Sequence, residues 1–446
     1  MVQEITDNFA SFHHIIECHE KGILAVSGGG DSMGLLAIFE MLIEKEQRQF
    51  WHVITVDHGL RAFSRQEAEL VKTLAASMGF TAHILEARHI TKSNKSASSR
   101  FARYKAIASY AQKNDLSICI TAHHKQDQIE TLMMRLFRGS GLDGLLGMRY
   151  DNAMFGMTIL RPCLCFTKQE LYSIATESKL PIFEDQSNKD LSYDRVKIRD
   201  NINQLEQQNI DTTKTIHTIN YLRSDADYIH QEVSRWWQEN TTIFNRDYIK
   251  LDRTSFNSLH IALKSRILSK AICLLNYGDY PPSLSRLHSL LNQDFALDQK
   301  HTLHKSVIYG EKNSLIVAPE VGRRGYQAIE VSLSQKSDLI WDKRYHLKLY
   351  QTAVQPNNNI FLIHLAGYGV KKLISDIKFY DNKDFNASYY INQLHNIPSI
   401  ARPSLMVIHA NLPNNQKMLF VPSIGLDTHQ LQPYLICEAI YKISNS

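Results

Sequence analysis

Residues 27–32 form the segment with the clearest potential for chemistry. They read Ser-Gly-Gly-Gly-Asp-Ser and join an apolar run at 23–26 to an apolar helical pattern. Glycines let a backbone approach a ligand closely, and the free N–H groups at a helix start attract phosphate; the three are Gly28, Gly29 and Gly30. Ser27 and Ser32 add hydroxyl donors. Asp31 would repel phosphate unless a divalent cation lay between them, so the segment predicts a site for a magnesium-bound nucleotide.

The order of residues separates this loop from two better-known nucleotide loops. No Lys follows the last glycine, as the P-loop of kinases and GTPases requires, and the loop lacks the G-x-G-x-x-G spacing of dinucleotide sites. A tight strand-to-helix turn that binds no ligand is the alternative interpretation.

Polar residues also follow the next predicted strand. Val-Asp-His-Gly-Leu-Arg at 56–61 places Asp57 where a ribose or base would lie, or forms only a capped turn. Arg100 and Arg103 are three residues apart on a predicted helix, beside Tyr104, so their guanidinium groups lie near one face. These arginines either clamp phosphate or are solvated.

Two adjacent histidines, His123 and His124, follow another predicted strand. Neighbours on a strand point to opposite faces, so the two rarely bind one metal ion. We expect one to line a nucleotide pocket and the other to pack. Asp127 and Glu130 lie three apart at a helix start, and they either hold magnesium or complement the helix N-terminus.

Glycines recur at 139–147, where they predict a mobile lid or a close approach to a ligand. Further along, Arg195 and Arg199 lie four residues apart on a predicted helix, with Lys197 between them in the sequence. This basic helix either contacts an RNA backbone or is a solvated surface helix.

The elements that must position these residues alternate between strand and helix up to about residue 184. Strands are predicted at 23–26, 52–57, 82–87, 118–122 and 158–161, and helices at 66–78, 98–112 and 128–137. Repeated β-α-β units predict an α/β fold with a doubly wound, mostly parallel sheet and a ligand site beyond the carboxyl ends of its strands.

Beyond residue 203 the pattern changes to a second, mainly helical domain that ends in a hairpin at 304–319. Its two longest helices are predicted at 216–239 and 258–275. The polar stretch 320–332 is predicted as a linker, and the rest as a small α+β domain. The predicted domains are a nucleotide-binding catalytic domain at 1–215, a helical domain at 216–325 and a C-terminal domain at 343–446.

Composition bounds the class of protein. The 446 residues are 43% hydrophobic and 21% charged, and the net charge is +5. Because this net charge is small, any nucleic-acid partner must bind to a local basic face. No apolar stretch approaches bilayer length and the N-terminus is too polar for a signal peptide, so we expect a cytoplasmic protein with no membrane partner. No obligate protein partner is indicated. Six scattered cysteines without a C-x-x-C pair favour neither a zinc site nor a disulfide framework.

In their order along residues 20–200, these motifs resemble those of bacterial tRNA(Ile)-lysidine synthetases, which belong to the PP-loop N-type ATP pyrophosphatases. The matching strings are Ser-Gly-Gly-Gly-Asp-Ser, Val-Asp-His-Gly-Leu-Arg, Arg-x-x-Arg-Tyr, Ala-His-His with a downstream Glu-Thr, Arg-Gly-Ser-Gly, Arg-Pro and Glu-Asp-x-Ser-Asn. Their joint occurrence is highly specific. The resemblance implies a catalytic domain of the adenine nucleotide alpha hydrolase-like fold.

The resemblance also implies the reaction. ATP and Mg²⁺ serve to adenylate the 2-carbonyl oxygen of the wobble cytidine in an isoleucine tRNA with a CAU anticodon, and the ε-amine of free L-lysine then displaces AMP to form lysidine. Nucleotide and metal binding is expected of Ser27, Gly28, Gly29, Gly30, Asp31 and Ser32, with Asp31 as the metal ligand. Asp31, Asp127 and Glu130 are the catalytic candidates, Asp57, Arg103 and His123 further nucleotide contacts, and Arg195 and Arg199 tRNA contacts.

A weaker resemblance covers the last domain. Lys-Lys-Leu at 371–373 and Ile-Pro-Ser-Ile-Ala-Arg at 397–402 resemble the family's C-terminal RNA-binding module. The candidate tRNA contacts there are Lys371, Lys372 and Arg402. The chain departs from the family twice: Gln126 precedes Asp127 where the family has two acids, and no Trp lies near Ile400.

Two other functions are compatible with parts of the sequence. A related PP-loop enzyme that thiolates tRNA generally needs cysteines for sulfur transfer or an iron–sulfur cluster, and this chain has no obvious pair. A nucleotide-sensing or RNA-binding module without catalysis would explain Gln126. It would not explain the joint presence of Asp31, Asp127 and Glu130.

Overall fold

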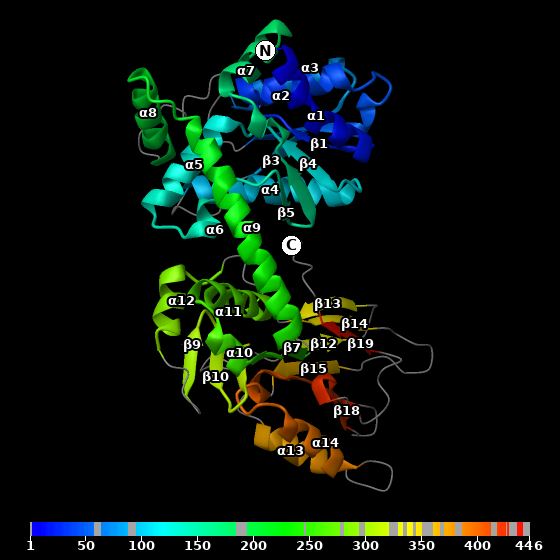
Figure 1. Cartoon of the computed structure of the whole chain (residues 1–446). Coiled ribbons are helices and arrows are strands. Elements are labelled where there is room, and N and C mark those ends of the chain that lie inside the picture. The colour runs from blue at the N-terminus through cyan, green and yellow to red at the C-terminus, as the bar shows by residue number, and fades with distance from the viewer. Residues whose placement is uncertain are drawn as a thin grey trace. The chain divides into compact units, whose positions relative to one another are not determined.

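The chain forms two compact units, residues 1–226 and 227–446 (Figure 1). The computed structural model describes residues 2–57, 64–87, 95–183, 194–244, 247–276, 281–293, 299–320, 329–332, 337–341, 345–349, 360–365, 370–379, 386–411, 417–424, 426–427 and 435–439. The boundary between the units falls within the long helix α9 (Lys214–Asn240). The nucleotide motifs predicted from the sequence all belong to the first unit.

A six-stranded sheet organises the first unit. Its order is β3-β2-β1-β4-β6-β5, and only the edge strand β5 runs antiparallel to its neighbour. The strands are β1 (Gly22–Ala25), β2 (Trp51–Asp57), β3 (Thr81–Glu86), β4 (Ile118–Thr121), β5 (Asp151–Met154) and β6 (Met157–Leu160). The chain order reverses between β1 and β4, and their carboxyl ends are therefore the point where a doubly wound sheet binds its ligand. The predicted fold class is confirmed.

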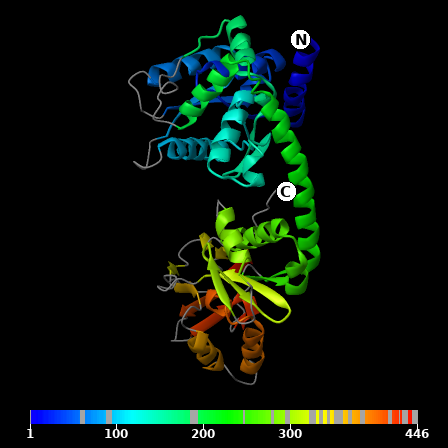
Figure 2. The same cartoon turned by 60° about the vertical axis from the view of Figure 1, so that its left-hand side comes forward.

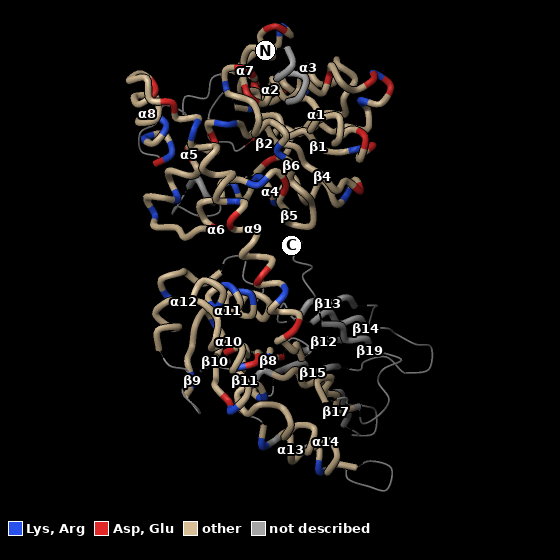
Figure 3. Tube along the Cα trace, viewed as in Figure 1, with Lys and Arg blue, Asp and Glu red and all other residues tan. Residues whose placement is uncertain are grey.

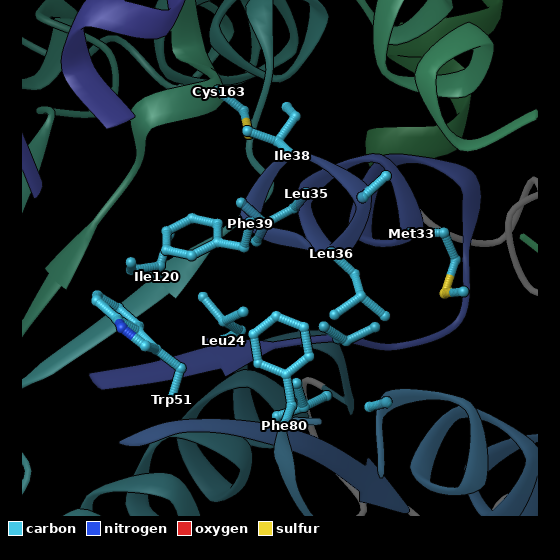
Figure 4. Close-up of a cluster of buried hydrophobic side chains, with 14 of the residues drawn as sticks. Leu24, Met33, Leu35, Leu36, Ile38, Phe39, Trp51, Phe80, Ile120 and Cys163 are labelled. Carbon is cyan, nitrogen blue, oxygen red and sulfur yellow. The ribbon is translucent and has the colours of Figure 1, made fainter. Parts of the chain in front are cut away.

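Helices cover both faces of this sheet. One hydrophobic core is lined by α1 (Val2–Cys18), α2 (Gly30–Leu42), α3 (Ser64–Ser77) and α7 (Lys168–Glu177), and the other by α4 (Lys95–Lys113). Successive strand residues alternate between the cores, since Leu24 packs in the first and Ile23 in the second. Figure 4 shows the first core, where the ring centroids of Phe39 and Trp51 are 5.1 Å apart.

Three further helices pack together in the first unit. They are α5 (Lys125–Phe137), α6 (Leu142–Leu145) and α8 (Asp194–Gln207), and α5 contacts α8. The strands and helices predicted up to residue 184 are all present with small shifts at their ends. Helices α1, α6 and α7 and strand β5 were not predicted from the sequence.

Residues 227–320 combine helices with a sheet that was predicted only in part. Helices α10 (Arg253–Ser258), α11 (Ile261–Asn276) and α12 (Leu284–Leu291) follow α9. Five antiparallel strands form the order β7-β8-β11-β10-β9, with β7 (Thr241–Phe244), β8 (Tyr248–Asp252), β9 (Lys300–Leu303), β10 (Ser306–Gly310) and β11 (Ser314–Pro319). The predicted hairpin is β10 and β11 (Figure 2). The two predicted long helices are α9 and α11.

The remaining residues form the predicted α+β region. One sheet has the order β12-β15-β16-β17-β18, a second the order β13-β14-β19. Their strands are β12 (Ile329–Ser332), β13 (Ser337–Trp341), β14 (Tyr345–Leu349), β15 (Ile360–Leu365), β16 (Met406–Asn411), β17 (Lys417–Val421), β18 (Leu426–Asp427) and β19 (Leu435–Ala439), with helices α13 (Val370–Phe379) and α14 (Ala387–Asn396). The predicted linker at 320–332 is wrong for 329–332, because β12 pairs with β15 there.

The two parts of the second unit share one hydrophobic core. Tyr248 and Ile316 of the first sheet pack in the same cluster as Leu373 of α13 and Leu394 of α14. This shared core explains why residues 227–446 form one compact unit. Among the described helices, none combines the length and apolar character needed to cross a membrane.

Candidate active site

The glycine-rich segment joins β1 to α2, and its glycines serve different purposes. Gly28 has a φ of +89°, and a Cβ there would lie 2.9 Å from the ring of Phe183. A Cβ on Gly30 would lie 2.7 Å from the ring of Tyr172. A Cβ on Gly29 would meet no atom closer than 3.9 Å. Packing therefore requires glycine at 28 and 30, whereas the open space at Gly29 fits a ligand that approaches the backbone.

The two serines brace the loop. The Ser32 hydroxyl donates to the Gly29 carbonyl oxygen at 2.9 Å and accepts from the Ser27 N–H at 3.1 Å. The two serine Oγ atoms lie 3.2 Å apart. Ser32 is buried, so its hydroxyl holds the shape of the loop in this structure.

Asp31 faces the end of the neighbouring strand β4. The Nε2 atom of His124 lies 3.5 Å from Asp31 Oδ2 and 3.5 Å from Asp127 Oδ2. The other Asp31 oxygen, Oδ1, is buried and has no hydrogen-bond partner. A buried carboxylate oxygen without a partner is costly, and it is the kind of atom that a divalent cation binds.

His124 lies in an acidic environment. Burial disfavours its charged form, but the carboxylates of Asp31, Asp127 and Glu130 outweigh burial and raise the pKa of His124 above its ordinary value. Its side chain is only 5% exposed. The protonated imidazole can therefore join the loop after β1 to the helix after β4.

His123 lies in the opposite environment. Its Nδ1 is 2.8 Å from the Oγ1 of Thr121. Burial is the main reason that the pKa of His123 lies well below its ordinary value, and four guanidinium groups lower it further: Arg100, Arg161, Arg195 and Arg103. His123 is therefore neutral near neutral pH, beside a group of arginines.

Asp127 and Glu130 bind the two arginines of α8. The Arg195 Nη2 donates to Asp127 at 2.5 Å, and its Nε donates to Glu130 at 2.5 Å. The Nε of Arg199 donates to the other Glu130 oxygen at 2.5 Å. Asp127 also accepts from the backbone N–H of His124 at 3.0 Å, at the start of α5. The Glu130 side chain is buried. Basic and acidic residues both lie along α8 (Figure 3).

Gln126 has a structural partner. Its Oε1 accepts from the backbone N–H of Lys168 at 2.9 Å, in the first turn of α7. Gln126 stands where the resemblance implied an acid, and it thus satisfies an N–H group that the start of α7 leaves without an intrahelical partner.

The glycine loop after α5 is anchored on its helix. Gln128 exchanges two hydrogen bonds with the backbone of Met148, at 2.7 and 2.6 Å. Arg135 donates to the carbonyl oxygens of Gly144 and Gly147 at 2.7 and 3.0 Å. A Cβ on Gly147 would lie 2.4 Å from the Gln128 amide oxygen. Packing accounts for this glycine, and the anchoring bonds do not favour the mobile-lid interpretation.

The other predicted site residues have contacts of their own. Asp57 accepts from the Ser64 hydroxyl at 2.8 Å at the end of β2. Arg402 donates to the carbonyl oxygens of Ile397 and His395, both at 2.9 Å, beyond the end of α14. Lys371 is exposed on α13. The side chain of Lys372 and the motifs at 58–61 and 184–188 lie outside the described residues.

The comparisons with known proteins agree with this geometry. Residues 1–206 match the family model described as PP-loop domain. A tRNA(Ile)-lysidine synthase of Wolbachia sp. subsp. Brugia malayi is 30% identical over 353 residues, which cover 77% of this chain and 79% of that protein. The chain belongs to the tRNA(Ile)-lysidine synthase family. Its relative in Wolbachia pipientis wMel is 31% identical over 72% of this chain and 75% of that protein. The relative in Novosphingobium aromaticivorans is 43% identical over 40% of this chain and 54% of that protein.

One contact of the cluster was not predicted from the sequence. We expected one of the two histidines to pack, and assigned the nucleotide to His123. In this member of the tRNA(Ile)-lysidine synthase family it is His124 that lies between Asp31 and Asp127. The spacing offered a signal, because an acid three residues after a helix N-cap often accepts from the N–H of the N-cap residue, as Asp127 does from His124.

Proposed function

We propose that this protein forms lysidine. It would join the ε-amine of free L-lysine to the wobble cytidine of an isoleucine tRNA with a CAU anticodon, while ATP is converted to AMP and pyrophosphate. Membership of the tRNA(Ile)-lysidine synthase family supports this reaction. The observation that carries it in the structure is the contact of Asp31 with His124 across the ends of β1 and β4, the ligand-binding point of a doubly wound sheet.

The first step transfers an adenylyl group. The 2-carbonyl oxygen of cytidine forms a bond to the α-phosphorus of ATP, and the bond to pyrophosphate breaks. The backbone at Gly29 and the N-terminus of α2 bind the departing pyrophosphate, because their N–H groups are fixed donors for negative charge. Asp31 is the residue that would hold Mg²⁺, which supplies neutralisation of the leaving group.

The second step uses the activated base. The neutral ε-amine of lysine forms a bond to C2 of the cytidine, AMP leaves with the former carbonyl oxygen, and the nitrogen releases a proton. Asp127 and Glu130 act here as positioning residues, since they hold Arg195 and Arg199 on α8.

We also propose that the second unit contributes to tRNA binding. Lys371 is exposed and available to a phosphate, and Lys372 follows it in the sequence. Arg402 already donates to two carbonyl oxygens, so its first role is to stabilise the end of α14. Reversing the charge of Lys371 tests the contact without disturbing the core that residues 227–446 share.

The deciding experiment is lysine transfer. Purified protein with Mg²⁺, ATP and labelled lysine should label an isoleucine tRNA with a CAU anticodon. A methionine tRNA with the same anticodon is the matched control and should accept little lysine. Label from a sulfur donor instead of lysine would establish thiolation, and RNA binding without either reaction would establish a binding module.

A further inference from the structure

Two exposed aromatic rings, one on α4 and one in the turn between β5 and β6, contact each other. The ring centroids of Phe101 and Phe155 lie 5.1 Å apart, with 82° between the ring planes. The two residues are 50% and 44% exposed. We propose that this pair stacks against an unpaired base of the tRNA anticodon loop, while Lys105 of α4 binds a phosphate of the same loop. This role rests on the proposed function, which supplies the tRNA.

The turn between β5 and β6 carries a residue that its backbone shape disfavours. Met154 pairs with Met157, which leaves a turn of two residues. These residues, Phe155 and Gly156, have φ values of +52° and +83°. Such turns are most often Asn-Gly or Asp-Gly, because a bulky side chain is strained in the left-handed region. A Phe at this position, with its ring exposed, indicates a role other than closing the turn.

The packing of the two rings leaves aromatic surface for a ligand. When the edge of one ring meets the face of another, at least one ring keeps both of its faces free of its partner. Neither Phe101 nor Phe155 packs in the two hydrophobic cores that cover the faces of the sheet. Unpaired bases of RNA loops stack on exposed rings of this kind, and every base offers a π-face.

A cation lies beside the rings at helical spacing. Lys105 is exposed and follows Phe101 by four residues on α4, so the two side chains share one face of the helix. Binding sites for single-stranded nucleic acid combine cations for the backbone with aromatic rings for the bases. This combination favours RNA over an apolar protein surface as the partner.

The pair also adjoins the candidate active site. Arg100 directly precedes Phe101, and after burial its charge is the next cause that lowers the pKa of His123 at the end of β4. Phe155 lies two residues before β6, which has four residues, so the ends of that strand are about 10 Å apart. A base near the wobble cytidine can therefore reach the rings when the cytidine lies at the carboxyl ends of the strands.

The variants Phe155→Asn and Phe101→Gln test the pair. Asn suits the left-handed region and Gln suits a helix, so each change removes a ring without disturbing the backbone. Phe155→Tyr keeps a ring, and Phe50→Gln is the matched control because Phe50 is 51% exposed outside the pair. The affinity of each protein is measured for the isoleucine tRNA and for a non-hydrolysable ATP analogue, together with its melting temperature.

We expect Phe155→Asn and Phe101→Gln to bind the tRNA about fivefold or more weakly, with unchanged affinity for the ATP analogue. Phe155→Tyr and Phe50→Gln should bind tRNA as the wild type does. The melting temperature of Phe155→Asn should be unchanged or higher, because the strain in the turn is relieved. Lys105→Met should reduce the salt dependence of tRNA binding by about one phosphate contact.

A fluorescent base tests stacking directly. 2-Aminopurine is placed at each position of the anticodon loop in turn, and stacking quenches its fluorescence. At one position the wild-type protein should quench the signal more strongly than Phe155→Asn does.

Unchanged tRNA affinity in both ring variants would overturn the proposal, as would a lower melting temperature of Phe155→Asn as its sole effect. A change only in concentration-dependent sedimentation would assign the rings to contact between two copies of the chain, and would overturn it too. These measurements need no lysine transfer. Failure of the proposed function would appear separately, as a wild-type protein that transfers no lysine to the tRNA.

Discussion

The ion pairs of Glu130 offer the sharpest test of the site's architecture. Replacing Glu130 by Gln removes one negative charge and keeps a side chain of similar size. The wild-type carboxylate accepts from Arg195 and Arg199 at 2.5 Å each. The variant would leave Arg199 without its carboxylate partner and Arg195 with Asp127 alone.

The expected loss follows from burial. Removing one partner of a buried ion pair costs about 3–5 kcal/mol. The side chains of Arg195 and Arg199 are 32% and 29% exposed, so water replaces part of the lost interaction. We therefore expect a loss of about 2–3 kcal/mol in the free energy of unfolding of the first unit, which lowers its melting temperature by about 4–10 °C.

Thermal unfolding of the variant measures this loss, and Glu69→Gln is the control. Glu69 pairs with Arg65 at 2.9 Å on the surface of α3, and both side chains are about half exposed. Such a pair contributes less than about 0.5 kcal/mol. Equal melting temperatures for the two variants would refute the buried ion-pair network. A double variant with Arg199→Met should cost little beyond Glu130→Gln, because that arginine has already lost its partner.

Three further predictions concern the loop and the strand end. Gly29→Ala should fold normally but bind an ATP analogue at least tenfold more weakly, and normal affinity would contradict a close approach of the nucleotide to this backbone. The comparison variant Gly34→Ala should destabilise the protein by about 1–3 kcal/mol, because its Cβ would lie 2.4 Å from a backbone oxygen of α7. Asp31→Asn should remain folded but lose magnesium-dependent release of pyrophosphate from ATP, and wild-type release would exclude Asp31 as the metal ligand. The pKa of His123 is lowered, so its contribution to stability is present above pH 6.5 and is lost as the pH falls below that value. In denaturant titrations between about pH 7.5 and 5, His123→Asn should therefore lose less stability than the wild type. Equal losses in the two proteins would contradict a buried, neutral imidazole.

The sequence predicted the parts of the fold that local patterns determine. Apolar runs such as 52–57 and 118–122 became β2 and β4, because a parallel strand is buried on both faces. The edge strand β5 reads Asp-Asn-Ala-Met and is mostly exposed, so it carries no apolar alternation to find. Strand β9 reads Lys-His-Thr-Leu and was missed for a similar reason.

The candidate site was predicted as a set of residues but not as a set of contacts. The motifs named Asp31, Asp127 and Glu130, and the family resemblance assigned them an order and a reaction. The partners of Glu130 lie 65 and 69 residues further along the chain, and no spacing rule connects positions so far apart. The same limit hid the bond from Lys168 to Gln126, which joins the first turns of α7 and α5.

The two histidines after β4 have a consequence for how the site takes up protons. One step along the backbone separates His124, whose neighbours are carboxylates, from His123, whose neighbours are guanidinium groups. The pKa values of the two imidazoles are therefore shifted in opposite directions although one peptide bond joins them. As the pH falls, His124 takes up a proton first, so the end of β4 gains its charge on the side that faces Asp31 and Asp127.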